Sequence, residues 1–124
     1  MGDGVLGHLR PDLIERLVTA ITNLVWAKQQ VLDLFHNAGV PERLLADYRD
    51  QLRLDRGSVK KSPIIRAILT RLNDAGDADW AIRMRRELVR RVTEWKDYET
   101  CQPDSEDVAR GAVAAVREIV GKYD

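Results

Sequence analysis

The chain has 124 residues, of which 44% are hydrophobic and 32% are charged, and its 20 basic and 20 acidic side chains cancel. This length fits one domain with a modest core, and the apolar fraction excludes a globally disordered chain. No apolar run approaches the roughly 20 residues that a membrane-spanning helix needs, so we expect no membrane partner.

Residues 1–9 contain three glycines and should form a flexible tail ahead of a single helical domain over residues 10–124. The opening residues lack the charged and then apolar pattern of a signal peptide. Cys101 is the sole cysteine, which fits a reducing compartment. We therefore expect a cytoplasmic location and no internal disulfide.

The first helix should begin at Pro11, whose fixed φ suits a first helical position, and bury an apolar stripe between Leu13 and Ile21. Two interpretations fit Thr22-Asn23, a break with a fresh cap or two weak helix formers inside a longer helix. We favour a break or kink. The second helix then stops at Asn37-Ala38-Gly39, where glycine suits a C-terminal cap.

Val40-Pro41 should start a short third helix whose inner face contains Leu44, Leu45 and Tyr48. The following stretch, Arg49–Lys61, alternates polar and apolar residues only briefly. Two interpretations therefore remain for it, a loop and a short extended hairpin arm.

A clear helix pair follows. Ser62 and Pro63 mark the start of its first helix, and Gly76 suits the left-handed conformation that ends it. Apolar residues recur between these signals at helical spacing, namely Ile64, Ile65, Ile68, Leu69 and Leu72. The second helix of the pair should run from about residue 78 to residue 96, capped by Asp77 or Asp79.

The arginines of the 78–96 helix fall into two groups at about 100° per residue. Arg83, Arg86 and Arg90 lie together opposite the apolar arc, whereas Arg85 lies inside that arc. An unpaired buried charge costs several kcal/mol, so Arg85 must reach solvent or a buried carboxylate. We interpret Arg85 as a structural residue in an ion pair.

Asp104, with Asp107 three residues later, resembles a capping box for a last helix that Gly121 closes. Five to six helices with short connections and almost no strand signal predict an all-α fold, a compact helical bundle.

Catalytic and metal sites need several groups at matched spacing. His8, His36 and Cys101 are isolated from one another in the sequence, and paired carboxylates stand at helix starts, where capping explains them. No glycine-rich phosphate loop follows a strand. We therefore expect a protein that is not an enzyme, with no metal site, no cofactor and no small-molecule substrate.

Charge is unevenly distributed: residues 53–96 carry 12 basic and 6 acidic side chains, and residues 97–124 carry 3 and 7. Candidate partner-binding residues are Arg83, Arg86, Arg90, Lys60 and Lys61, with Arg66 and Arg71 as further members. Three interpretations fit this basic group: a solvated face, a surface for an acidic protein partner, and a phosphate-binding surface for nucleic acid. Segregated charge also allows copies of the chain to associate head to tail.

The segment from Ile68 to Val120 contains Arg71-Leu72-Asn73-Asp74 with Gly76, then RRELVRRVTEWKDYETCQPD (85–104) and ARGAVAAVREIV (109–120). It resembles helical N-terminal domains of bacterial anti-phage defence proteins, which precede nuclease, protease or other effector parts. Size and helix count are also similar to the CARD-like death-fold modules of such systems. The resemblance implies a recruitment module that acts through contacts of its helical bundle.

These observations favour a non-catalytic adaptor module that brings a bacterial antiviral defence effector to its sensor, or to another copy through oligomerisation. The alternative is a nucleic-acid-binding domain that uses the basic face of the 78–96 helix.

Overall fold

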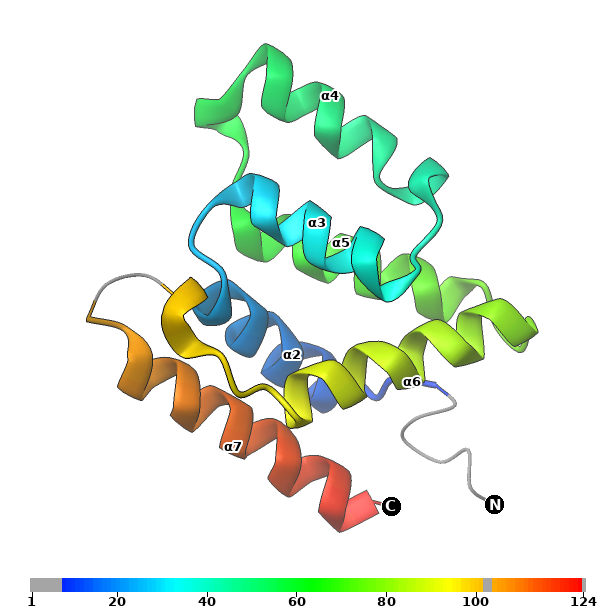
Figure 1. Cartoon of the computed structure of the whole chain (residues 1–124). Helices are drawn as coiled ribbons and strands as arrows, with labels where there is room; N and C mark the ends of the chain where they lie inside the picture. Colours follow the sequence, from blue (N-terminus) through cyan, green and yellow to red (C-terminus); the bar gives the residue numbers. More distant parts are fainter. Residues whose placement is uncertain (1–7, 102–103, 124) are drawn as a thin grey trace.

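A computed structural model describes residues 8–101 and 104–123, and all regular secondary structure in this part of the chain is helical, as predicted. The described residues form six α-helices and no strand, arranged as in Figure 1. The α-helices are α2 (Pro11–Leu24), α3 (Lys28–Ala38), α4 (Ala46–Leu54), α5 (Lys61–Asp74), α6 (Asp79–Thr93) and α7 (Glu106–Tyr123). Three short 3-10 helices are η1 (Glu42–Leu44), η2 (Arg56–Ser58) and η3 (Tyr98–Thr100).

Helix α2 lies at the centre of the bundle. It packs most extensively against α7, then against α5, and it also contacts α6. Helix α3 contacts α5 and α6, and α4 lies beyond α3 at the edge of the bundle (Figure 1). Because α4 contacts mainly α3 and its own flanking turns, Leu52 is its one buried residue.

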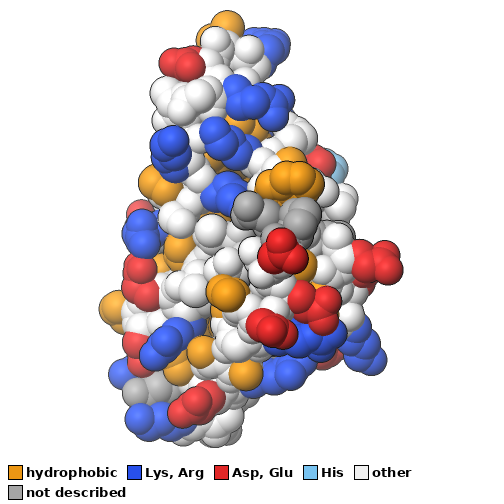
Figure 2. Space-filling model, turned by 90° about the vertical axis from the view of Figure 1, so that its left-hand side faces the viewer, with side chains coloured by type: hydrophobic (Ala, Val, Ile, Leu, Met, Phe, Trp, Pro, Cys, Tyr) orange, Lys and Arg blue, Asp and Glu red, His pale blue; other side chains and the backbone are white. Residues whose placement is uncertain are grey.

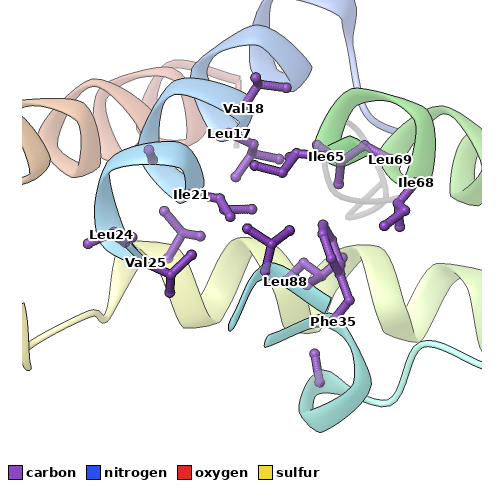
Figure 3. Packing of buried hydrophobic residues seen from close by; sticks show 14 of the residues in the cluster. Leu17, Val18, Ile21, Leu24, Val25, Phe35, Ile65, Ile68, Leu69 and Leu88 are labelled. Atoms are coloured by element: carbon purple, nitrogen blue, oxygen red, sulfur yellow. The ribbon is translucent and has the colours of Figure 1, made fainter. Parts of the chain in front are cut away.

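The hydrophobic core brings together helices that are distant in sequence. Figure 3 shows buried side chains from these helices pointing toward one another, among them Leu17 and Ile21 of α2, Phe35 of α3, Ile65 of α5 and Leu88 of α6. Complete burial of such a side chain contributes roughly 1.5–3 kcal/mol relative to exposure. The predicted apolar stripes of α2, α5 and α6 therefore supply the contacts that hold the bundle together.

Arg85 lies in this core and is 0% exposed. Its Nη1 donates to the carbonyl oxygen of Leu72 at 2.5 Å, and its Nη2 donates to that of Gly76 at 2.8 Å. These carbonyls lie at the C-terminal end of α5, where unpaired carbonyl groups carry partial negative charge. Burial lowers the pKa of Arg85, and the nearby charge of Asp77 opposes that shift. The predicted structural role is confirmed, but the expected carboxylate partner is wrong, because backbone carbonyls take its place.

The predicted break between the first two helices exists but lies over residues 25–27 rather than at Thr22-Asn23. The ammonium group of Lys61, from α5, holds this end of α2. It donates at 2.9, 3.0 and 3.1 Å to the carbonyl oxygens of Thr22, Val25 and Trp26. A lysine that is distant in sequence therefore satisfies carbonyl groups that have no partner within α2.

Two other sequence-based expectations are wrong. The stretch Arg49–Lys61 is neither a loop nor an extended arm, because α4 continues to Leu54 and η2 follows it. Neither Asp77 nor Asp79 caps α6 through its side chain, since Ala78 is at the N-cap position. By contrast, Gly76 has the predicted left-handed conformation, with φ of 65°.

The start of the chain is fixed from Leu9 onward. Residues 1–7 of the expected flexible tail lie outside the described residues, but Leu9 is buried. Its N–H donates to Oδ1 of Asn73 at 2.9 Å, and its carbonyl oxygen accepts from Nδ2 of the same side chain at 2.8 Å. These two bonds join the entry of α2 to the end of α5.

Candidate functional site

The three arginines predicted to share one side of α6 do so. Arg83, Arg86 and Arg90 are exposed, whereas Leu88 and Val92 on the opposite side are buried in the core. The apolar stripe of α6 therefore fixes the direction in which these guanidinium groups point. We call Arg83, Arg86 and Arg90 the arginine face.

An open hollow of about 410 Å³ lies beside the arginine face. The arginines line it together with Ala38 at the end of α3 and with Met84 and Glu87 of α6. Gly39, which follows α3, has φ of 107°, and a Cβ atom there would lie 2.9 Å from Sδ of Met84. The close approach of α3 to α6 at this hollow therefore requires glycine at position 39.

Carboxylates neutralise one end of the arginine face. Arg90 donates through Nη2 to Glu87 at 2.6 Å and through Nη1 to Glu94 at 3.2 Å. Arg91 donates through Nε to the same Glu87 carboxylate at 2.7 Å. Hydrogen bonds from Arg90 and then Arg91 hold the pKa of Glu87 below its ordinary value, although desolvation opposes them.

The other end keeps its positive charge exposed. Arg83 makes no hydrogen bond or ion pair with any other described residue, and Arg86 is also exposed. Apart from the buried Arg85, four arginines (83, 86, 90 and 91) and two glutamates (87 and 94) give this stretch a net charge of +2. An exposed guanidinium fork beside an apolar hollow suits a carboxylate that is accompanied by an apolar side chain.

The two predicted lysines lie elsewhere. Lys61 is at the end of α2, where it donates to three carbonyl groups, and Lys60 is the exposed N-cap residue of α5. That location is near the first residue of α3, whereas the hollow is lined by Ala38, the last residue of α3. An 11-residue helix spans roughly 16 Å, so the lysines and the arginine face belong to separate surfaces.

The further basic residues of α5 are used within the bundle. Arg66 donates from Nε and Nη2 to the Glu15 carboxylate, at 2.8 Å for each bond. The guanidinium carbon of Arg71 lies 5.3 Å from the ring centroid of Tyr48. These contacts link α5 to α2 and to α4, so neither arginine extends the arginine face.

Sequence reasoning identified the arginines but missed the apolar part of the site. The pairing of Glu87 with Arg90 and Arg91 is visible in the sequence as helical spacings of three and four residues. Ala38 belongs to the site only because α3 packs across α6, and no local pattern signals that contact.

Within residues 8–101 and 104–123, no three His, Cys, Asp or Glu side chains converge as a candidate metal site. Cys101 donates from Sγ to the carbonyl oxygen of Tyr98 at 2.8 Å. None of the described helices combines the length and apolar character that crossing a bilayer requires.

Comparison of the chain with protein-family models, with curated proteins and with solved structures gives no match. The geometry and charge of its surfaces therefore carry the functional inference.

Proposed function

We propose that the chain is a non-catalytic protein-interaction module whose arginine face binds an acidic protein partner. In this role it acts as an adaptor that recruits a bacterial defence effector. The resemblance of Ile68–Val120 to helical domains of anti-phage proteins supports this setting, and a death-fold arrangement of the bundle is part of the same proposal.

The observation that carries the proposal is the combination of two features on one side of α6. Arg83 and Arg86 are exposed there, and beside them an open hollow is lined by Met84 and Ala38. Protein interfaces typically combine an apolar centre with a polar rim, and arginine is enriched at their energetically important positions. The fitting partner segment carries one or two carboxylates next to an apolar side chain.

Nucleic-acid binding by the same face is the second candidate. It is supported by the exposed guanidinium groups, which suit phosphates. The carboxylates of Glu87 and Glu94 weigh against it, because they neutralise Arg90 and repel a phosphate backbone. The arginine face therefore favours a partner with separate carboxylates over a continuous polyanion.

Pull-downs with the purified chain as bait, followed by titration of the partner that they identify, test this proposal. We expect Arg83→Glu combined with Arg86→Glu to weaken partner binding roughly tenfold or more, because like charges then face each other. Arg90 is left in place, since reversing it would add a third carboxylate beside Glu87 and Glu94. Arg16→Glu is the control, because Arg16 is an exposed arginine of α2, away from the arginine face.

Unchanged affinity of the folded double variant would remove the arginine face from the interaction. The second candidate predicts instead that single-stranded or duplex probes bind at low salt and are released steeply as salt rises. Such binding, lost in the same double variant, would replace the protein partner with nucleic acid.

A further inference from the structure

A second surface, separate from the arginine face, exposes large apolar side chains. Trp26, in the connection between α2 and α3, is 57% exposed, and Val108, in the first turn of α7, is also 57% exposed. Leu54, at the end of α4, is 79% exposed. These segments lie on the same side of the bundle in Figure 1, the side that Figure 2 turns toward the viewer.

One half of this surface is basic. Trp26, Lys28 and Arg56 line a hollow of about 410 Å³, and Nζ of Lys28 donates to the carbonyl oxygen of Arg56 at 2.7 Å. Lys60 lies beside them, because its neighbour Lys61 is bonded to the carbonyl of Trp26 at 3.1 Å. Figure 2 shows Lys and Arg side chains gathered in the upper part of this face, with apolar side chains among them. We call Lys28, Arg56 and Lys60 with Trp26 the basic half.

The other half is acidic. Asp104 just before α7 and Asp107 within its first turn are neighbours of Val108 in the sequence, and the exposed Glu99 belongs to η3, which contacts α7. Figure 2 shows Asp and Glu side chains gathered near the middle of the same face, below the Lys and Arg group. We call Glu99, Asp104 and Asp107 with Val108 the acidic half.

Arg110 does not cancel this acidic charge. It bonds Glu106 at 2.7 Å, and its guanidinium carbon lies 4.2 Å from the ring centroid of Tyr98. The acidic half therefore keeps three negative groups against three positive groups in the basic half.

A surface that carries positive and negative charge side by side favours some classes of partner over others. A membrane or a long nucleic acid presents negative charge over its whole length, so the acidic half would repel it while the basic half attracted it. A second copy of this chain has the complementary arrangement. Rotated by 180° about an axis between the two halves, it places its acidic half on the basic half of the first copy, and its basic half on the acidic half.

We infer that this face is a two-fold interface between two copies of the chain. Trp26 of the basic half and Val108 of the acidic half supply its apolar contacts, and the opposite charges of the two halves pair across it. The inference goes beyond the proposed function, because it uses a different surface and a different partner. It also changes the head-to-tail association expected from the sequence into a closed dimer, since both halves lie on one side of the bundle. Each dimer contains the contact between a basic half and an acidic half twice, so a substitution that reverses one charge changes two contacts in the dimer.

Two charge-reversal variants of the full chain test the inference. The first carries Arg56→Glu with Lys60→Glu, and the second carries Glu99→Lys with Asp107→Lys. Asp104 is left unchanged, because its φ of 67° is tolerated by Asp better than by Lys. Lys28 is also left unchanged, because it holds the carbonyl of Arg56.

We expect sedimentation velocity to show a concentration-dependent dimer of the wild type at about 50 mM salt that weakens at about 500 mM salt, where exposed charges are screened. Each folded variant alone should associate at least roughly tenfold more weakly, because like charges then meet across the interface. An equimolar mixture of the two variants should form a one-to-one complex. Both halves of the first variant are negative and both halves of the second are positive, so opposite charges meet at each contact. Arg83→Glu with Arg86→Glu should dimerise like the wild type, which separates this test from that of the proposed function.

Three results would overturn the inference. The first is a wild type that stays monomeric at low salt and high concentration. The second is dimerisation of either variant as strong as that of the wild type. The third is a mixture of folded variants that forms no complex. A monomeric wild type that binds single-stranded nucleic acid through Arg56 and Lys60 would also assign the basic half to a polyanion instead of a second copy.

Discussion

Arg85 donates through its guanidinium to the carbonyl oxygen of Leu72, so a cation from α6 closes the C-terminal end of α5. Carbonyl groups at a helix end have no partner within the helix, and their partial negative charge replaces the carboxylate that a buried cation ordinarily needs. Within the described residues, Nε of Arg85 is buried without a hydrogen-bond partner. The carbonyl groups of Leu72 and Gly76 therefore both gain a hydrogen-bond donor, whereas one nitrogen of the guanidinium keeps an unused donor.

Replacing Arg85 should destabilise the fold more than replacing any exposed arginine. Arg85→Met keeps most of the buried volume but leaves the carbonyls of Leu72 and Gly76 without donors. We expect a loss of roughly 2–4 kcal/mol in the free energy of unfolding, since each buried carbonyl without a partner costs about 1–3 kcal/mol. Urea denaturation measures this loss, and Arg83→Met, which removes an exposed guanidinium, should change it by less than about 0.5 kcal/mol. Equal stability of the two variants would show that Arg85 does not hold the helix end.

Lys61 should stabilise the end of α2 in the same manner. Lys61→Met removes the ammonium group that three carbonyls share, among them that of Val25. We expect a loss of roughly 1–2 kcal/mol in the free energy of unfolding, because water reaches part of this helix end and satisfies some of the carbonyls. The neighbouring Lys60→Met is the control and should change stability by less than about 0.5 kcal/mol. A loss of similar size in both variants, measured by urea denaturation, would argue against a specific cap.

The sequence predicted best those helices whose apolar residues recur at regular spacing. Helix α5 buries five residues on one stripe, and both it and α6 appear close to the predicted ranges. The predicted short helix from Val40-Pro41 corresponds to η1 and the start of α4, but the continuation of α4 to Leu54 was missed, because α4 buries only Leu52. Its stability comes from contacts with other elements, such as the Arg71–Tyr48 ring contact, which no local pattern records.

The break at the end of α2 was misplaced for a similar reason. Asn23 donates from Nδ2 to the carbonyl oxygen of Thr19 at 2.8 Å, and Oγ1 of Thr22 lies 3.2 Å from Oγ of Ser62, so both are accommodated within the helix. The carbonyl groups at the end of α2 find their donor in Lys61, a residue of α5 that no pattern near Thr22-Asn23 indicates. The same limit explains why Lys60 and Lys61 were grouped with the arginine face: helical spacing orders residues within one helix but not between helices.

Glu87 should make the stability of the arginine face depend on pH. Its pKa in the folded state is held below the ordinary value of 4.5, first by the hydrogen bond from Arg90. An acid with a lowered folded pKa contributes stability that is present above its unfolded pKa and is lost as pH falls through the folded pKa. Glu87→Gln should therefore cost roughly 0.5–1 kcal/mol at neutral pH, the range for partly exposed ion pairs, and almost nothing at a pH well below 4.5.

Paired urea titrations at neutral and acidic pH measure this difference. Glu118→Gln is the matched control, because Glu118 is exposed on α7 and has no ion pair among the described residues. As a surface substitution it should change the free energy of unfolding by less than about 0.5 kcal/mol in either titration. If Glu87→Gln lost as much free energy of unfolding in acid as at neutral pH, the loss would come from packing rather than from charge.

Two glycines should respond oppositely to alanine. Gly39 has φ of 107°, and an added Cβ would lie 2.9 Å from Sδ of Met84, so Gly39→Ala combines backbone strain with a contact at the hollow. We expect a loss of roughly 1–3 kcal/mol. Gly111 lies inside α7 with no atom within 4 Å of its added Cβ, so Gly111→Ala should gain roughly 0.5–1 kcal/mol from helix propensity. Thermal denaturation should therefore move the two midpoints in opposite directions, and a Gly39→Ala midpoint at or above that of the wild type would mean that α3 does not approach α6 as closely as this contact requires.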